Sequence, residues 1–354
     1  MSMLRDVLID EIATTGPLRF DAYMARALLD PKMGYYTQAR AIGAAGDFVT
    51  APEISQMFGE LIGLCFVQYW MDLGQPERVV LAELGPGHGT LMADVLRVAQ
   101  RVPGFAAALR VALIEASPSM RKRQQDTLKA FDVNWIETVD DLPELPIFVL
   151  ANEFFDALPI RQFQWAPSGW QERYVLTDAA GLCTQWHPIE PHDHDILSRF
   201  EGVQHGDIVE VCPQLTPMIA DLTQRIERDG GAGLVIDYGD WHSLGDTVQS
   251  LSDHKPIDPL AAPGQSDLTA HVDFEALAQA AQCSYAKLAT QGVFLERLGI
   301  TARAQSLAKS LTGEALETHI AAHNRLTHPQ EMGALFKVMG FYQSGKPCLP
   351  GLEP

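Results

Sequence analysis

The sequence lacks the marks of a secreted, membrane-spanning or zinc-binding protein. Its 354 residues include only five cysteines, an odd number with no CxxC pair, so we expect free thiols without a disulfide framework or a zinc site. No apolar run approaches the ~18 residues of a membrane span. The acidic N-terminus has the pattern of neither a signal peptide nor a mitochondrial presequence. We therefore expect a cytoplasmic protein with no membrane insertion.

Basic side chains are also scarce. The chain has 26 lysine and arginine residues against 45 aspartate and glutamate residues, which gives a formal net charge of -19. This charge disfavours binding to nucleic acid or to anionic lipid, and it suits a basic partner. With 47% hydrophobic residues, the chain is long enough to form one elaborated domain or two.

One histidine-rich stretch raises the question of a metal site. The segment "PHDHD" (191–195) offers two imidazoles and two carboxylates, but it lies in a polar region with no further ligand nearby. Zinc sites usually combine three or four convergent protein ligands. We therefore interpret these side chains as solvated and predict no metal.

Residues 1–74 are predicted to form a helical N-terminal extension. In "LRFDAYMARALLD" (18–30) and in residues 53–74, apolar residues recur every three or four positions, which indicates helices with one buried face. Gly74 is placed to end the second helix. Between them, "GYYTQARAIGAAGDFVTAP" (34–52) is rich in glycine and small residues, and it predicts a loop.

From residue 78 the pattern changes to short apolar runs separated by helix-like stretches. Such runs predict the strands of a parallel sheet with helices on both faces, and therefore an α/β fold. Four runs have this pattern: "VVLAEL" (79–84), "VALIEA" (111–116), "IFVLAN" (147–152) and "GLVIDYG" (233–239).

The remaining segments are predicted to elaborate this sheet. Residues 161–176 read as a hairpin about a Pro-Ser-Gly turn, inserted between the fourth and fifth strands. Residues 267–281 read as a loop entering a helix, while "TQGVFL" (290–295) and "ALFKVMGF" (334–341) read as two closing strands. The predicted Rossmann-like domain has two parts, residues 75–159 and residues 213–345. Residues 160–212 are predicted to form an insertion between them, and residues 346–354 a C-terminal tail.

The turn after the first run, "ELGPGHGT" (83–90), predicts a nucleoside cofactor. A P-loop would need a lysine after its last glycine, and a dinucleotide turn would need glycine or alanine where Thr90 stands. The remaining pattern, acid-x-Gly-x-Gly-x-Gly, resembles motif I of class I S-adenosylmethionine-dependent methyltransferases. The expected cofactor-binding residues in the turn are Glu83, Gly85, Pro86, Gly87, Gly89 and Thr90.

Acidic and amide side chains end the next runs. Glu115 lies 30 residues after Gly85 and is placed to accept hydrogen bonds from ribose hydroxyls, an arrangement that would also suit NAD. Asn152 is expected on the cofactor side. Glu153 and Asp156 are candidate catalytic residues, since a planar carboxylate fits a guanidinium. The alternative is that either acid only caps the following helix.

Several longer phrases follow one another over most of the chain: "DPKMGYY", "GDFVTAPEISQMFGE", "ELGPGHGTLMAD", "NEFFDALPIRQF", "IDYG", "DLTAHVDF" and "EMGALFKV". Together they resemble the MidA-type family, whose mitochondrial members are complex I assembly-factor methyltransferases. The resemblance implies S-adenosylmethionine as methyl donor and arginine methylation of a protein partner, which in mitochondrial members is a core complex I subunit. The missing presequence pattern favours a bacterial-type member.

The resemblance also makes "GDFVTAPEIS" (46–55) a candidate lid. Thr50 and Glu53 are expected to form a capping box. His271 is a candidate for accepting a proton or positioning the substrate, with a structural role as the alternative. The candidate substrate and lid residues, in which the two tyrosines would form an aromatic wall for a cation, are Tyr35, Tyr36, Asp47, Phe48, Thr50 and Ser55.

Two other functions stay open at this point. An NAD-dependent oxidoreductase would share the sheet and Glu115, but this turn lacks the third glycine of a dinucleotide site. A catalytically inactive methyltransferase fold could act as an assembly chaperone for a client subunit. The intact cofactor motifs argue against this second alternative.

Overall fold

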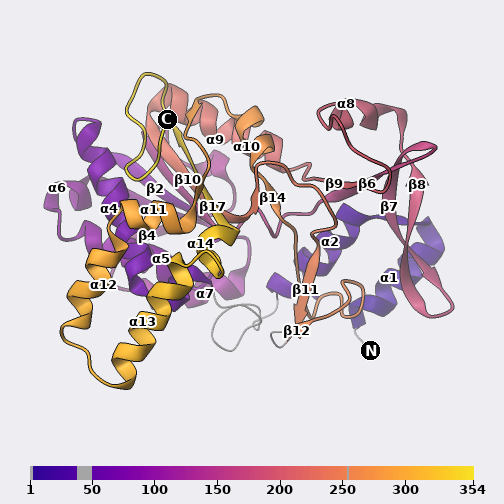
Figure 1. Ribbon diagram of the computed structural model, residues 1–354, viewed down its shortest axis with the longest axis horizontal. Helices are drawn as coiled ribbons and strands as arrows, with labels where there is room; N and C mark the ends of the chain where they lie inside the picture. The colour runs from indigo at the N-terminus through magenta and orange to yellow at the C-terminus, as the bar shows by residue number, and fades with distance from the viewer. Residues whose placement is uncertain (1–2, 38–49, 253–254) are drawn as a thin grey trace.

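The computed structural model describes residues 3–37, 50–252 and 255–354. Figure 1 shows a larger lobe, built on a central sheet with helices on both faces, beside a smaller lobe that holds α1, α2 and the strands β6 to β9. The predicted α/β fold class is confirmed. None of the described helices combines the length and the apolar character that crossing a membrane requires.

The central sheet has the strand order β15-β17-β10-β5-β2-β3-β4. The four predicted parallel strands are confirmed as β2, β3, β5 and β10. The sequence did not predict β4, because its "VNWI" is short and only one of its residues is buried. The strands are β2 (Val79–Leu84), β3 (Leu109–Ile114), β4 (Val133–Ile136), β5 (Ile147–Asn152), β10 (Gly231–Asp240) and β17 (Phe336–Tyr342), with the short β14 (Val272–Asp273), β15 (Ser284–Tyr285) and β16 (Ala289–Thr290).

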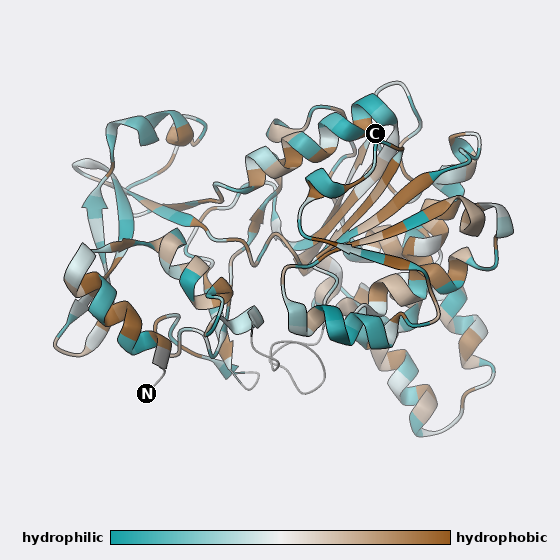
Figure 2. Ribbon diagram, turned by 180° about the vertical axis from the view of Figure 1, so that it is seen from behind, coloured by the Kyte–Doolittle hydropathy of each residue, from teal (hydrophilic) through white to brown (hydrophobic). Residues whose placement is uncertain are grey.

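Hydrophobic cores lie on both faces of this sheet. Every residue of β2 is buried, and successive side chains point to opposite faces. Leu81 belongs to a core that includes residues of α4, α5, α6, α11 and α12, whereas Val80 belongs to a core that includes residues of α9 and α10. Figure 2 shows the strands of this sheet as largely hydrophobic. The helices of the lobe are α4 (Gln56–Asp72), α5 (Thr90–Ala99), α6 (Pro103–Ala108), α7 (Pro118–Thr127), η2 (Val139–Asp141), α9 (Leu215–Asp229), α10 (Phe274–Ala280), α11 (Gln291–Arg297), α12 (Ile300–Ala308), α13 (Glu314–Thr327) and α14 (Met332–Leu335).

Of the two predicted closing strands, only the second is confirmed. β17 pairs antiparallel with β10 along its whole length. The segment 290–295 instead begins α11, where Gln291, Phe294 and Leu295 are buried at the i, i+3, i+4 spacing of a helix. A short apolar run does not distinguish a strand from a helix by its periodicity alone.

The smaller lobe is built on a second sheet, of order β1-β7-β6-β9 with β8 beside β7. The predicted hairpin is confirmed as β6 and β7, which pair antiparallel. A three-stranded sheet of order β12-β11-β13 adjoins this lobe. The elements are α1 (Met3–Thr15), β1 (Leu18–Arg19), α2 (Phe20–Leu29), η1 (Tyr35–Thr37), β6 (Arg161–Ala166), β7 (Gly169–Asp178), β8 (Gly181–Pro188), η3 (Pro191–Asp193), α8 (His194–Leu197), β9 (Ile208–Val211), β11 (Gln249–Ser252), β12 (Lys255–Pro256) and β13 (Asp267–Thr269).

The structure groups these elements differently from the predicted segments. β1 pairs with β7, so the start of the chain joins the insertion at 160–212 in one lobe. α4, the other helix of the predicted extension, packs instead in the core of the larger lobe. The tail at 346–354 also belongs to that core, where Leu349 and Leu352 are buried. The predicted extension therefore divides between two hydrophobic cores.

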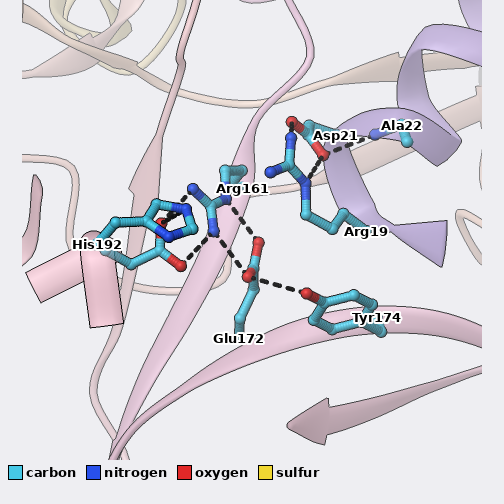
Figure 3. A network of polar contacts seen from close by, with 8 residues as sticks. Arg19, Asp21, Ala22, Arg161, Glu172, Tyr174 and His192 are labelled. Atoms are coloured by element: carbon cyan, nitrogen blue, oxygen red, sulfur yellow. Dashed lines mark hydrogen bonds and ion pairs between the residues drawn. The ribbon is translucent and has the colours of Figure 1, made fainter. Parts of the chain in front are cut away.

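A buried ion-pair network holds the smaller lobe together. Nε and Nη2 of Arg161 lie 2.6 and 2.7 Å from the carboxylate of Glu172, and Nη1 and Nη2 lie 2.6 and 2.8 Å from that of Asp193. Figure 3 shows the guanidinium between its partners. All three residues are buried. The interpretation of residues 191–195 as solvated is therefore wrong for Asp193, because it neutralises a buried arginine.

We expect Arg161→Met to destabilise the protein by about 3–5 kcal/mol, because two carboxylates would stay buried without their partner. The matched control is Arg19→Met, since Arg19 pairs with Asp21 in the same lobe but has 43% of its side chain exposed. An exposed pair of this kind contributes ~1 kcal/mol or less. Urea unfolding of the full chain measures both, and equal losses in the two variants would contradict the prediction.

Candidate active site

The glycine-rich turn joins β2 to α5, and its backbone requires glycine. Gly85, Gly87 and Gly89 have φ angles of +60°, +51° and +80°, which residues with a Cβ rarely adopt. A Cβ on Gly85 would also lie 2.7 Å from Cδ2 of Phe154. Gly89 is the N-cap residue of α5, so the turn presents backbone N–H groups and a helix N-terminus to its surroundings.

Two cavities lie beside this turn, at the carboxyl ends of the parallel strands. One has a volume of about 230 Å³ and the other of about 70 Å³, and both border Thr50, Gly85, Gly87 and Glu153. Gly89 borders neither. The predicted cofactor residues that line one or both cavities are Glu83, Gly85, Pro86, Gly87, Thr90, Glu115 and Asn152.

Glu115 stands at the larger cavity, and a neighbouring glutamine ties it to the turn. Its Oε1 accepts the backbone N–H of Ser117 at 2.7 Å, and its Oε2 accepts a hydrogen bond from Nε2 of Gln124 at 3.0 Å. The same amide nitrogen donates to the carbonyl oxygen of Gly87 at 2.8 Å. Burial raises the pKa of Glu115 above its usual value, although these hydrogen bonds oppose the shift.

Glu83 stands at the smaller cavity, and its environment suits a cationic ligand. Only 3% of its surface is exposed, and burial raises the pKa of its carboxyl to about 8. Its Oε2 has no hydrogen-bond partner among the described residues, and neither has Oδ1 of Asn152. The ammonium group of S-adenosylmethionine fits these acceptors, whereas a pyrophosphate would bring negative charge close to a buried acid.

Asp237 fixes the turn that follows β5. This buried residue of β10 accepts hydrogen bonds at Oδ2 from the backbone N–H groups of Phe154, Phe155 and Asp156, at 3.2, 3.0 and 3.3 Å. The turn places Glu153 at a φ of +51°, which is rare for a residue other than glycine. Strain of this kind persists only where the surroundings hold it, and it is typical of functional sites.

The turn places two acids at the larger cavity. Burial and the charge of Asp156 raise the pKa of Glu153 to about 7, against the hydrogen bonds from Ala51 and Asn152. Burial raises the pKa of Asp156 to about 6, although a hydrogen bond from the hydroxyl of Tyr238 opposes it. Oδ1 of Asp156 has no hydrogen-bond partner within the described part of the chain. Both acids therefore favour the approach of a cation.

Helix α3 (Ala51–Ile54) connects the two turns, since Pro52 and Glu53 border the smaller cavity. The backbone N–H of Ala51 donates to Oε1 of Glu153 at 3.1 Å, and the hydroxyl of Thr90 donates to Oε1 of Glu53 at 2.6 Å. Glu153 therefore holds the first turn of α3 as well as facing the cavity.

The expected capping box at α3 does not form. The side chain of Thr50 makes no capping hydrogen bond, because Glu53 turns toward Thr90 instead. Ser55 caps the next helix, α4, by accepting the N–H of Met57 at 3.2 Å. The other two candidate lid residues, Asp47 and Phe48, lie outside the described residues.

The two adjacent tyrosines have different surroundings. Tyr36 borders the larger cavity, and its hydroxyl donates to Oδ1 of Asp267 at 2.8 Å. Tyr35 is buried in the core of the smaller lobe, with its ring edge-on to that of Tyr36. Of the predicted aromatic wall, the structure therefore brings only Tyr36 to the cavity.

His271 lies apart from the larger cavity. It borders a different hollow of about 430 Å³ between the lobes. Its ring is edge-on to that of Tyr238, with the centroids 5.5 Å apart, and burial lowers its pKa. Its role as a catalytic residue stays a prediction.

Several residues that complete the larger cavity were not predicted from the sequence. Those that line the cavity come from strands β10 and β13. The sequence feature that could have indicated these residues is the presence of polar side chains in two of the quoted segments, "IDYG" and "DLTAHVDF". The unselected residues are Tyr238, Asp267 and Thr269, with Asp237 and Gln124 supporting the site.

A Rossmann-like sheet, a turn of three glycines at the end of its first strand and an acid at the tip of the next define a class I methyltransferase. Residues 61–292 match the family described as "Putative S-adenosyl-L-methionine-dependent methyltransferase", and the chain belongs to this family. The chain is therefore a methyltransferase whose cofactor is S-adenosylmethionine. This confirms the resemblance found in the sequence.

The chain is also similar to named relatives. It is 36% identical to "Protein arginine methyltransferase NDUFAF7, mitochondrial" of Homo sapiens, over 94% of this chain and 82% of that protein. It is 32% identical to the Drosophila melanogaster homolog, over 94% and 83%. These relatives are mitochondrial by name, which contradicts the expected cytoplasmic location. That expectation had rested on the cysteines, the lack of long apolar runs and the composition of the N-terminus.

Two solved structures share the whole architecture. One is a "likely methyl transferase" from Burkholderia thailandensis bound to S-adenosyl-homocysteine, 29% identical with a TM-score of 0.84, covering 98% of this chain and 94% of that one. The other is a native structure of an uncharacterized protein from the same organism, also 29% identical, with a TM-score of 0.83 and coverages of 98% and 93%. The likeness includes the smaller lobe as well as the sheet.

We expect Gly87→Val to abolish binding of S-adenosylmethionine, because a branched side chain would enter the cavity from a backbone of positive φ. The matched control is Gly74→Val, which places the same side chain at a φ of +83° with open space around it, far from the cavities. Isothermal titration with the cofactor measures both variants. Unchanged affinity in Gly87→Val would refute the assignment of this turn.

Proposed function

We propose that this methyltransferase transfers a methyl group to an arginine side chain of a protein partner. The observation that carries the proposal is a buried oxygen of Asp156 that has no hydrogen-bond partner among the described residues, in a cavity that Glu153 and Asp267 also border. Burial of several acids around one cavity favours a cationic occupant. The arginine methyltransferases among the relatives support the same substrate class.

A guanidinium fits this cavity better than the other cationic side chain of proteins. Arginine offers five N–H donors in one plane, which can bind carboxylates on more than one side. Lysine offers a compact charge that gains little from acceptors in a plane. A protein partner with exposed arginines also suits the net charge of -19. We propose a respiratory complex I subunit as this partner, as the family resemblance implies.

The protein's own side chains would orient the acceptor and take up a proton. When bound, S-adenosylmethionine supplies an activated methyl group. The guanidinium nitrogen would lose one proton as its new N–C bond forms and the S–CH3 bond of the donor breaks. S-adenosyl-homocysteine would leave with the electron pair on sulfur, and the methylated product would keep its positive charge. Asp156 is the better proton acceptor, because Oε1 of Glu153 already accepts hydrogen bonds from Ala51 and Asn152. Glu153 would then add negative charge and hold α3.

The activity is expected to rise with pH between about 5.5 and 7.5. The pKa values of Asp156 and Glu153 are raised to about 6 and about 7, so both acids become neutral as the pH falls through this range. A cationic acceptor needs their charged forms, which makes kcat/KM increase with pH. Measuring kcat/KM for a peptide acceptor as a function of pH tests this rise. In Asp156→Asn, the part of the rise near pH 6, which belongs to Asp156, should disappear. A flat profile in the unmodified enzyme would count against both assignments.

The reaction itself can be tested with labelled S-adenosylmethionine. The enzyme is incubated with an extract of host proteins, and the methylated peptides are identified by mass spectrometry. We expect methylarginine, and a loss of about 10²-fold or more in Asp156→Asn, the usual scale for removing a general base. Glu137→Gln is the control, because this acid is 79% exposed. Methyl-lysine, methyl-glutamine or no product would each reject arginine methylation, and the last would favour the inactive chaperone.

A further inference from the structure

We propose that the substrate guanidinium binds between two tyrosine–aspartate pairs, one from each lobe, and that Tyr36 and Asp267 of the second pair determine specificity for arginine. This inference rests on the proposed function and names the residues that would recognise the arginine side chain of the substrate. Neither Tyr238 nor Asp267 was singled out by the sequence.

The first pair belongs to the larger lobe. Tyr238 lies within the buried strand β10 and borders the larger cavity with Asp156 and Thr269, and a hydrogen bond from its hydroxyl opposes the rise in the pKa of Asp156. Asp156 is only 6% exposed, and the hydrogen bond that its backbone N–H donates to Asp237 fixes the position of the residue. Its Oδ1 remains without a partner among the residues described. This atom is a buried acceptor that a ligand can satisfy.

The second pair comes from segments of the chain outside the methyltransferase sheet. Tyr36 lies in η1, which is separated from the end of α2 by residues 30–34, and Asp267 begins β13. Oδ1 of Asp267 accepts the hydroxyl of Tyr36 at 2.8 Å and the backbone N–H of Leu268 at 2.9 Å, and both bonds help to orient the carboxylate. Asp267 is 6% exposed, and burial raises the pKa of Tyr36 well above its usual value. The tyrosine therefore stays a donor.

Both pairs face the same space. All four residues border the 230 Å³ cavity, together with Glu153. The charge of Asp156 also contributes to the raised pKa of Tyr36. Two carboxylates on different walls match the several edges of a guanidinium, and a tyrosine ring can pack against its face. An ammonium is a compact charge without the planar fork of N–H donors that a guanidinium offers.

Tyr36 and Asp267 come from other segments than the residues assigned to the cofactor, although three of those residues, Gly85, Gly87 and Glu115, also border the larger cavity. Tyr36 and Asp267 do not border the smaller cavity, where Glu83, Pro86 and Asn152 lie. Removing either member of the small-lobe pair should therefore weaken the binding of arginine and leave the binding of the cofactor product unchanged. A general structural defect would weaken both.

The experiment measures binding to the full-length protein saturated with S-adenosyl-homocysteine, so that no turnover interferes. The probes are N-acetyl-arginine-N-methylamide and N-acetyl-lysine-N-methylamide, titrated by NMR. We expect the unmodified protein to prefer the arginine probe. Asp267→Asn should bind it about tenfold more weakly and Tyr36→Phe about fivefold, since hydrogen bonds to charged groups are the strong ones. The affinity for the lysine probe should change less.

The matched control is Tyr174→Phe. Tyr174 is in the smaller lobe and its hydroxyl also donates to a carboxylate, that of Glu172, at 3.4 Å, but it lies away from the cavity. This variant should bind the arginine probe as the unmodified protein does. If Asp267→Asn fails to bind S-adenosyl-homocysteine, its fold is affected, and Tyr36→Phe, which removes one oxygen atom, decides the question.

The outcomes distinguish this inference from the proposed function. If the unmodified enzyme forms methylarginine but Tyr36→Phe and Asp267→Asn keep its affinity for the arginine probe, the second pair does not read the substrate and the inference fails alone. Equal binding of the arginine and lysine probes by the unmodified protein also overturns it. If no methylarginine forms in the extract, the proposed function fails.

Discussion

The site depends on one carboxylate oxygen that binds three consecutive backbone N–H groups. Oδ2 of Asp237 receives these bonds from residues 154–156, and Oδ1 accepts the N–H of Tyr238. A strand of the sheet thereby holds the turn that follows its neighbour, and it stabilises the rare backbone angle of Glu153. This contact therefore orients the two acids of that turn, Glu153 and Asp156. Burial and the charges of Asp156 and Glu153 raise the pKa of Asp237, and the backbone donors oppose that shift.

The same constraint explains why the site favours cations. Glu83, Glu153 and Asp156 are withdrawn from water, and burial is the largest cause of the raised pKa of each. Arg325 lowers the pKa of Glu153, but it is an exposed residue of α13 and does not border the cavities. Charged ligands can supply the missing compensation. S-adenosylmethionine and arginine are both cations, so each would lower these pKa values on binding and thereby gain affinity.

Much of this fold was predictable because its signals are local. Six consecutive buried residues in β2 and in β5, and three glycines at fixed spacing, are visible in a short window of sequence. The part of the site beyond the glycine turn could not be predicted, because its contacts join distant segments of the chain. Tyr36 contacts Asp267, which is 231 residues away, and Phe155 contacts Asp237, which is 82 residues away. The N-terminal segment divided between two cores for the same reason, since the pairing of β1 with β7 leaves no mark in either strand alone.

The smaller lobe matters to the site through rigidity as well as through contact. Arg161 ties β6 to β7 by its ion pair with Glu172, and β7 pairs with β1, which leads directly into α2. α2 ends shortly before η1, where Tyr36 stands. The buried network therefore fixes β7, and through β1 and α2 it helps to position Tyr36 at the larger cavity. Loosening it would displace Tyr36 while leaving the glycine turn and Glu83 in place, because these belong to a separate core. Stability of the smaller lobe and affinity for the acceptor should thus vary together, independently of affinity for the cofactor.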